Sequence, residues 1–135
     1  EAQLDRFMFK IPIDYPAKDE EVQIVRETTA LREVTLAPVM TAAQVLEVQK
    51  VVRKIPVSEA VIRYAVDLVS ATRPKSAEAP EFVKLWVRWG AGPRASQYLI
   101  LAAKARAAIR GNFAASTHDV EAVAPLVLRH RSRGE

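Results

Sequence analysis

The chain contains no cysteine and only two histidines, His118 and His130. Without thiols it can form neither a disulfide nor a reactive thiolate, and two imidazoles are too few for a histidine-built metal centre. No apolar run approaches the roughly 18 residues that a membrane-spanning helix needs. The acidic, polar N-terminal residues lack the basic and apolar regions of a signal peptide. We therefore expect a cytoplasmic protein with no metal site and no membrane span.

What the chain does contain is an ordinary globular composition. Half of its 135 residues are apolar and 27% are charged, which is typical of soluble proteins. A chain of this length can bury one real hydrophobic core but has little room for a second.

The charge balance is basic, with a net charge of +4 and a pI near 9.6. Such a balance raises the question of nucleic-acid binding, so the distribution of the charges matters. Positive residues are spread over the whole chain except in the tail 129–133, which has no interleaved aromatic residues on which bases could stack. We predict a solvated, poorly ordered terminus there, and nucleic acid is disfavoured as a partner.

An alternating pattern near the N-terminus predicts one strand. Phe7, Phe9, Ile11 and Ile13 are separated by single residues, the period of a strand. A lone strand is not stable in water, so this segment is expected to join a sheet that the rest of the chain does not supply.

Most of the remaining chain predicts helices, because apolar residues recur at spacings of three and four. Capping boxes at Thr41 with Gln44 and at Ser116 with Asp119 support two of the starts. The segment 57–73 has the widest apolar surface and is expected to be the central helix of a bundle. The predicted helices cover about 18–32, 41–55, 57–73, 93–110 and the segment after residue 116.

Before the fourth of these helices, the segment 82–89 alternates apolar and polar residues and predicts a short extended piece. Its Trp86 and Trp89 are expected to anchor the core, although they could also line a ligand rim. The predicted fold is mainly α, a small helical bundle preceded by one short strand.

The segment Gly90–Ser96 contains the residues best suited to binding a ligand, in this case an anion. Gly92 suits an N-cap and Pro93 the first helical position, which puts Arg94 on the opening turn. A helix start already attracts anions through its free N–H groups and its dipole. An arginine placed there adds donors whose geometry suits phosphate.

Two motifs resemble one known family. The sequence GAGPRAS at 90–96 resembles the GAxPRAS signature that opens the sensor 2 helix of MoxR-type AAA+ ATPases, and EAQLDRF at 1–7 resembles the segment that closes their catalytic core. Their order and separation also match. The resemblance implies that residues 1–16 are the C-terminal edge of an AAA+ core and that residues 17–135 form the α-helical lid domain.

The resemblance also implies roles for two arginines. Arg94 would be the sensor 2 arginine, facing the γ-phosphate of ATP, and Arg6 a catalytic arginine finger donated in trans to a neighbouring subunit. In the intact protein it implies ATP with Mg, a homo-oligomeric ring, and remodelling or maturation of partner proteins, a von Willebrand factor A domain protein among them. In such a chaperone, the resemblance implies that Arg94 couples the position of the lid to the nucleotide state.

Other interpretations stay open from the residues alone. Arg6 could form a surface ion pair with Asp5, and Arg94 could bridge to an acid of a nearby helix. The chain contains neither a GxxxxGK[ST] loop nor magnesium-binding acids after an apolar run, so by itself it should neither hydrolyse ATP nor bind it tightly. The alternative function is an independent helical interaction module that binds nucleic acid through its basic surface.

Overall fold

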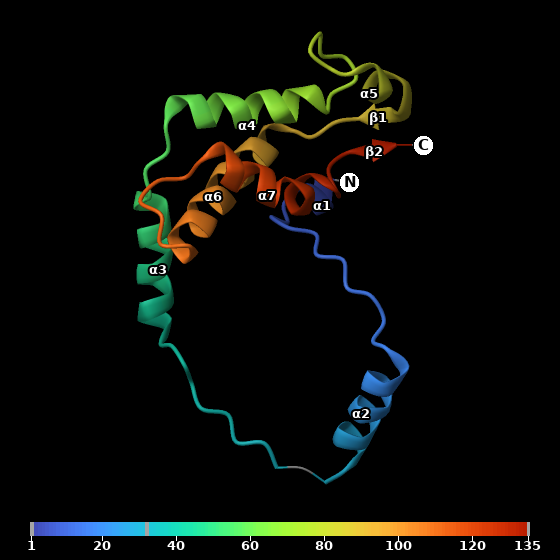
Figure 1. Ribbon diagram of the computed structural model, residues 1–135, viewed down its shortest axis with the longest axis vertical. Coiled ribbons are helices and arrows are strands. Elements are labelled where there is room, and N and C mark those ends of the chain that lie inside the picture. Colours follow the sequence, from blue (N-terminus) through green and yellow to red (C-terminus); the bar gives the residue numbers. More distant parts are fainter. Residues whose placement is uncertain (1, 32, 135) are drawn as a thin grey trace.

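The computed structural model describes residues 2–31 and 33–134; residues 1, 32 and 135 lie outside the described part. The chain is mainly helical, as predicted (Figure 1). Among the described residues, no helix is both long and apolar enough to cross a membrane. The elements are α1 (Ala2–Asp5), α2 (Lys18–Thr29), α3 (Ala42–Lys54), α4 (Glu59–Ala71), α5 (Glu81–Trp86), β1 (Val87–Trp89), α6 (Pro93–Ile109), α7 (Thr117–Leu128) and β2 (Arg133–Gly134).

The core centres on α6, which packs against α3, α4 and α7. The prediction that the helix over 57–73 would be central is therefore wrong. That helix, α4, buries one face through Val61, Ala65 and Val69. In α6 small side chains let neighbouring helices approach closely on several sides. The buried residues of α6 are Ala95, Leu99, Ala102, Ala103 and Ala107.

Local capping signals fix the helix ends as predicted. The Thr41 hydroxyl accepts a hydrogen bond from the Gln44 N–H at 3.2 Å, and the Ser116 hydroxyl accepts one from the Asp119 N–H at 3.3 Å. After α6, Gly111 adopts φ 72°, a left-handed conformation that glycine tolerates best.

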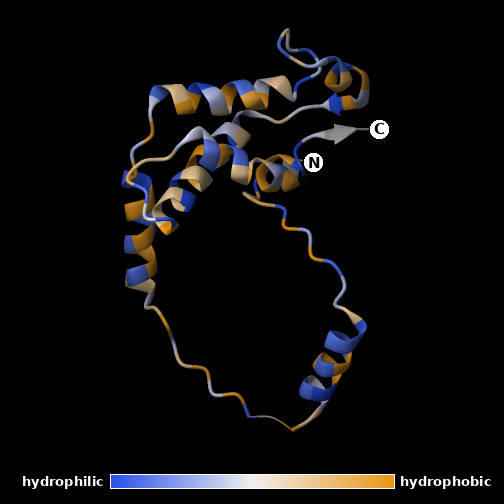
Figure 2. Ribbon diagram, in the orientation of Figure 1, coloured by the Kyte–Doolittle hydropathy of each residue, from blue (hydrophilic) through white to orange (hydrophobic). Residues whose placement is uncertain are grey.

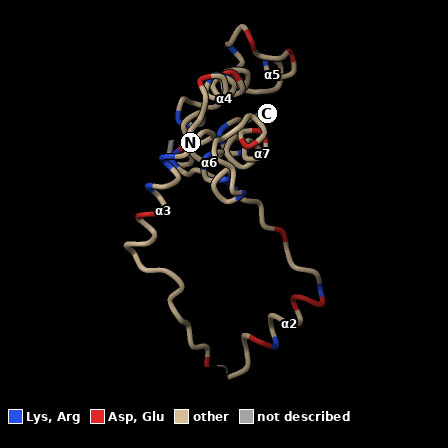
Figure 3. Tube along the Cα trace, turned by 60° about the vertical axis from the view of Figure 1, so that its left-hand side comes forward, with Lys and Arg blue, Asp and Glu red and all other residues tan. Residues whose placement is uncertain are grey.

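Between the N-terminal segment and α3, the chain makes a wide excursion that carries α2 away from the helical body (Figure 1). No residue of α2 is buried. One side of α2 is apolar and the other polar (Figure 2), and acidic residues crowd its first turn (Figure 3). Val22, Ile24 and Val25 are exposed, so α2 presents an amphipathic surface that the described residues do not cover.

The strand expected over 7–13 does not form, and this part of the prediction is corrected. Within the described residues no other strand pairs with the segment, and an isolated strand has no ladder to satisfy its backbone. The segment is anchored to the body by the Lys10 N–H, which donates to the Leu126 carbonyl at 2.9 Å. Beyond that anchor, Ile11 and Ile13 are exposed.

The segment 82–89 is also only partly as predicted. Its first part is the helix α5, and the extended part is β1 alone, which pairs antiparallel with β2 at the C-terminal end. Phe82 lies three positions before Leu85 and four before Trp86. These spacings are typical of a helical turn, although the segment also alternates apolar and polar residues. Val83 is the residue of α5 that is buried, whereas Trp86 is 67% exposed and is not a core anchor. Trp89 is half-buried.

Candidate functional site

The loop that precedes α6 is pinned to the end of α4. The Ala91 N–H donates to the Thr72 hydroxyl at 2.9 Å, and the Arg73 Nε donates to the Ala91 carbonyl at 2.9 Å. A Cβ at Gly90 would lie 2.2 Å from the Thr72 carbonyl oxygen, so this close approach requires glycine. The start of α6 is therefore held in a fixed place.

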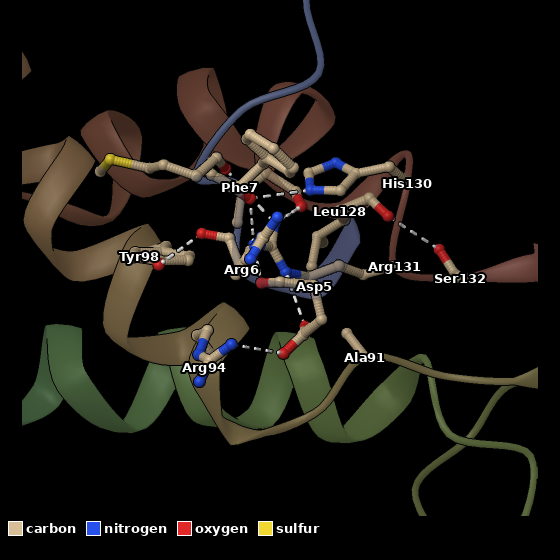
Figure 4. Close-up of polar contacts among 12 residues, drawn as sticks. Asp5, Arg6, Phe7, Ala91, Arg94, Tyr98, Leu128, His130, Arg131 and Ser132 are labelled. Carbon is tan, nitrogen blue, oxygen red and sulfur yellow. Dashed lines mark hydrogen bonds and ion pairs between the residues drawn. The ribbon is translucent and has the colours of Figure 1, made fainter. Parts of the chain in front are cut away.

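Arg94 lies in the first turn of α6, as the sequence predicts. Gly92 is the N-cap and Pro93 opens the helix. The Arg94 side chain remains 48% exposed, and its Nη1 lies 3.5 Å from Oδ2 of Asp5. Figure 4 shows the guanidinium directed toward the N-terminal segment. Arg94 does bridge to an acid, but at the surface rather than inside the bundle, and the acid belongs to α1.

A second arginine that contacts Asp5, Arg131, comes from the C-terminal tail. The Arg131 side chain is 1% exposed, and its Nε lies 3.1 Å from Oδ1 of Asp5. It donates to the carbonyls of Asp5 at 2.8 Å and of Met8 at 3.3 Å, and also contacts those of Phe7 and Val127. The guanidinium carbon lies 5.0 Å from the centre of the Tyr98 ring, within cation–π range.

Burial of Arg131 corrects the prediction of a solvated, poorly ordered tail. Its guanidinium satisfies carbonyl groups of the N-terminal segment, so the two ends of the chain are fastened together (Figure 4). The tail is adapted to bind this segment of its own chain, and the burial of one of its charges weakens the nucleic-acid interpretation.

Arg6 is exposed at the same end of the molecule. Its guanidinium lies 5.5 Å from the centre of the Phe7 ring, and its carbonyl accepts a hydrogen bond from the Tyr98 hydroxyl at 2.9 Å. The alternative of an ion pair between Arg6 and Asp5 is absent from the described contacts, because the Asp5 carboxylate faces Arg94 and Arg131 instead. Among the described residues, no acidic side chain pairs with the exposed Arg6 guanidinium.

The geometry thus places two guanidinium groups, those of Arg94 and Arg131, against the single carboxylate of Asp5, and the exposed Arg6 follows Asp5 in the chain. Such an excess of positive charge at a helix start favours a further anion. The sequence pointed to Arg94 and Arg6 but not to Asp5 as a bridge or to Arg131. Nothing local signals that pairing, because Asp5 and Arg131 are 126 positions apart.

A further ion pair, between Arg106 and Asp119, has a structural role. The Arg106 Nη1 is 2.5 Å from Oδ1 of the buried Asp119. Burial raises the pKa of the Asp119 carboxyl, but hydrogen bonds from Ser116 and then the Arg106 guanidinium outweigh it, so that the net pKa is lowered. This cluster fastens the start of α7 to α6.

Two other titratable side chains, those of Tyr64 and His118, contact Glu121. The hydrogen bond that the Tyr64 hydroxyl donates to Glu121 raises the pKa of Tyr64. His118 is exposed, as expected for a residue in a first helical turn, and its Nδ1 lies 3.8 Å from Glu121. Across 2–31 and 33–134, no group of three or more His, Asp or Glu side chains is placed to hold a metal ion.

Comparison with known proteins agrees with this arrangement. Residues 80–135 match the family model of the AAA lid domain. The chain is 37% identical over 131 residues to "Chaperone MoxR1" of Mycobacterium tuberculosis, covering 97% of this chain and 34% of that protein. It is 30% identical over 132 residues to "Uncharacterized protein YeaC" of Bacillus subtilis, covering 97% of this chain and 38% of that protein.

A solved structure matches as well. The crystal structure of a provisionally assigned ATPase from Cytophaga hutchinsonii superposes with a TM-score of 0.86 and 30% identity, covering 99% of this chain and 41% of the other. The chain thus spans little more than a third of its curated relatives. In sequence and fold, it belongs with the C-terminal lid region of the MoxR-type AAA+ ATPases.

Proposed function

We propose that the chain is the nucleotide-responsive lid portion of an ATPase that couples ATP binding and hydrolysis to the remodelling or maturation of partner proteins. Residues 17–135 would form the lid and residues 1–16 the edge of the ATPase core. The observation that carries this proposal is the Arg94 guanidinium, which is half exposed at the start of α6 with one carboxylate 3.5 Å away.

Electrostatics support a phosphate as the natural partner of Arg94. The N-terminal end of α6 carries the positive end of the helix dipole, which disfavours a cation there unless an anion compensates both. Asp5 supplies one negative charge, but it also faces Arg131. A γ-phosphate would bring further negative charge and bind the guanidinium through two parallel hydrogen bonds.

Arg6 is proposed to act in trans. Its exposed guanidinium would stabilise the transition-state charge at the site of the next subunit in a homo-oligomeric ring. The phosphate-binding loop and the acids that hold Mg would come from sequence that this chain does not contain, so the chain would contribute charges to ATP hydrolysis without performing it alone. A von Willebrand factor A domain protein is the proposed kind of partner, and the cytoplasm the proposed location.

The alternative of a self-sufficient helical module has less support. Val22, Ile24, Ile11 and Ile13 are exposed to solvent in this chain, although their amphipathic pattern is typical of residues that pack against another surface. This arrangement favours a chain that works as part of a larger assembly.

The test of the proposal is Arg94→Ala in the full-length protein, with ATP affinity and steady-state ATP turnover as the measurements. Loss of a charge-assisted hydrogen bond costs about 1.5–3 kcal/mol, so ATP affinity should fall by about 10- to 150-fold. Arg63→Ala is the matched control, because Arg63 is an exposed arginine whose partner is Glu59 of its own helix. Unchanged affinity and turnover in Arg94→Ala would refute the nucleotide role.

The role of Arg6 has its own test. Arg6→Ala should lower turnover by about 10³- to 10⁵-fold, as expected for an arginine finger, while leaving ATP affinity nearly intact. Mixing the variant with subunits that cannot bind ATP but retain Arg6 should restore turnover, because the arginine acts on a neighbour. Failure of such mixtures to recover would show that Arg6 does not act in trans.

A further inference from the structure

The two contacts of the Asp5 carboxylate are unequal. Oδ1 lies 3.1 Å from the Nε of Arg131, whose side chain is buried and also bonded to several backbone carbonyls. Oδ2 lies 3.5 Å from the Nη1 of Arg94, which is half exposed. Figure 4 shows Asp5 between the two arginines. One arginine is fixed in place, and the other is held weakly.

We infer that Asp5 is a positioning residue for Arg94: its carboxylate holds the guanidinium until a nucleotide phosphate displaces it. This inference rests on the proposed function of Arg94. In the protein without nucleotide, the carboxylate of Asp5, the residue that precedes Arg6, competes with the phosphate for the Arg94 guanidinium.

Moving the Arg94 guanidinium from the Asp5 carboxylate to a phosphate costs little free energy, because Arg131 stays bound to Asp5. When Arg94 leaves, the Asp5 carboxylate keeps its contact with Arg131 and is not left as an unpaired charge. The Asp5 backbone also stays in place, since Arg131 holds its carbonyl at 2.8 Å. The phosphate therefore competes only against an exposed ion pair, which is weak.

A competing contact lowers the apparent affinity of the ligand by the fraction of molecules in which the binding group is occupied. Removal of the Asp5 charge should therefore tighten the binding of a nucleoside triphosphate, and only when Arg94 is present. A merely structural role of Asp5 predicts the opposite, namely equal loss of affinity with and without Arg94.

The experiment is a double-mutant cycle in the full-length protein with Asp5→Asn, Arg94→Ala and the double variant. The measurement is the Kd of a non-hydrolysable ATP analogue, with ADP as the comparison ligand without a γ-phosphate. Asp5→Asn keeps an oxygen acceptor for Arg131 and should preserve the fold, which circular dichroism checks. Asp14→Asn is the matched control, because Asp14 is exposed and bonds only to the adjacent Tyr15 N–H among the described contacts.

We expect Asp5→Asn to tighten analogue binding by about two- to fivefold, the range of an exposed ion pair. The change should vanish in the Arg94→Ala background and be smaller for ADP. Asp5→Glu keeps the negative charge and should bind the analogue with nearly the original affinity.

Four outcomes would overturn the inference. If Asp5→Asn weakens binding, or changes it equally in both Arg94 backgrounds, Asp5 does not compete for Arg94, and the proposed function stands. If Asp5→Glu tightens binding as Asp5→Asn does, the charge is not responsible. If Arg94→Ala alone leaves the affinity unchanged, the proposed function fails, and this inference fails with it.

Discussion

The contact between the two ends of the chain offers the sharpest physical prediction. Replacing Arg131 by Met keeps much of the aliphatic stem but removes every hydrogen bond that the guanidinium donates to the N-terminal segment. The rest of the body, centred on α6, does not depend on those bonds. The substitution should therefore release the segment 5–8 locally rather than unfold the protein.

The magnitude follows from the contacts. Arg131 is placed against four oxygen atoms of this segment: the Asp5 carboxylate and the carbonyls of Asp5, Phe7 and Met8. A hydrogen bond to a charged group contributes about 1.5–3 kcal/mol, but the freed oxygens regain water because the segment lies near the surface. We take the lower bound for each of the four bonds and halve their total to allow for this hydration. The free energy of opening then falls by about 3 kcal/mol, which is roughly a hundredfold in the opening equilibrium.

Amide hydrogen exchange measures this opening directly. The Lys10 N–H, bonded to the Leu126 carbonyl, should exchange roughly a hundredfold faster in Arg131→Met, while amides of α6 keep their protection. Arg129→Met is the control, since Arg129 is a neighbouring, exposed arginine. Unaltered exchange at Lys10, or faster exchange throughout α6, would refute the conclusion that Arg131 holds the N-terminal segment locally.

The remaining predictions concern packing and pH. Gly90→Ala should lower the free energy of unfolding by about 3 kcal/mol, because the added Cβ would lie 2.2 Å from the Thr72 carbonyl oxygen. Gly92→Ala should lower it by less than about 1 kcal/mol, since a Cβ at Gly92 would meet no atom within 4 Å. Urea denaturation of both variants measures these changes, and equal values for the two would contradict the prediction. Because the pKa of Asp119 is lowered in the folded state, its stabilising effect is fully present above its ordinary value of 3.8 and is lost as the pH falls through the lowered value. Asp119→Asn should therefore cost about 3 kcal/mol at pH 7 and much less at pH 2–3, and a pH-independent cost would show that the charge is not what stabilises α7.

Features with local causes could be predicted from the sequence. The caps at Thr41 and Ser116 and the opening of α6 at Gly92 form as predicted, because each depends on side chains within a few positions. The placement of Arg94 on the first turn of α6 follows from the same local signals.

Features that depend on contacts between distant residues could not be predicted. Burial of Arg131 requires carbonyl groups from the other end of the chain, and the central place of α6 depends on how three helices meet its alanines. The strand expected over 7–13 shows the same limit, since a strand pattern forms a strand only where a partner is available.

The most direct test of the account is a structure of the full-length protein bound to a non-hydrolysable ATP analogue. We expect the Arg94 guanidinium to leave Asp5 and to lie within about 3 Å of a γ-phosphate oxygen, with Asp5 still bonded to Arg131. An analogue bound with Arg94 still paired to Asp5 and no contact to the phosphate would contradict it.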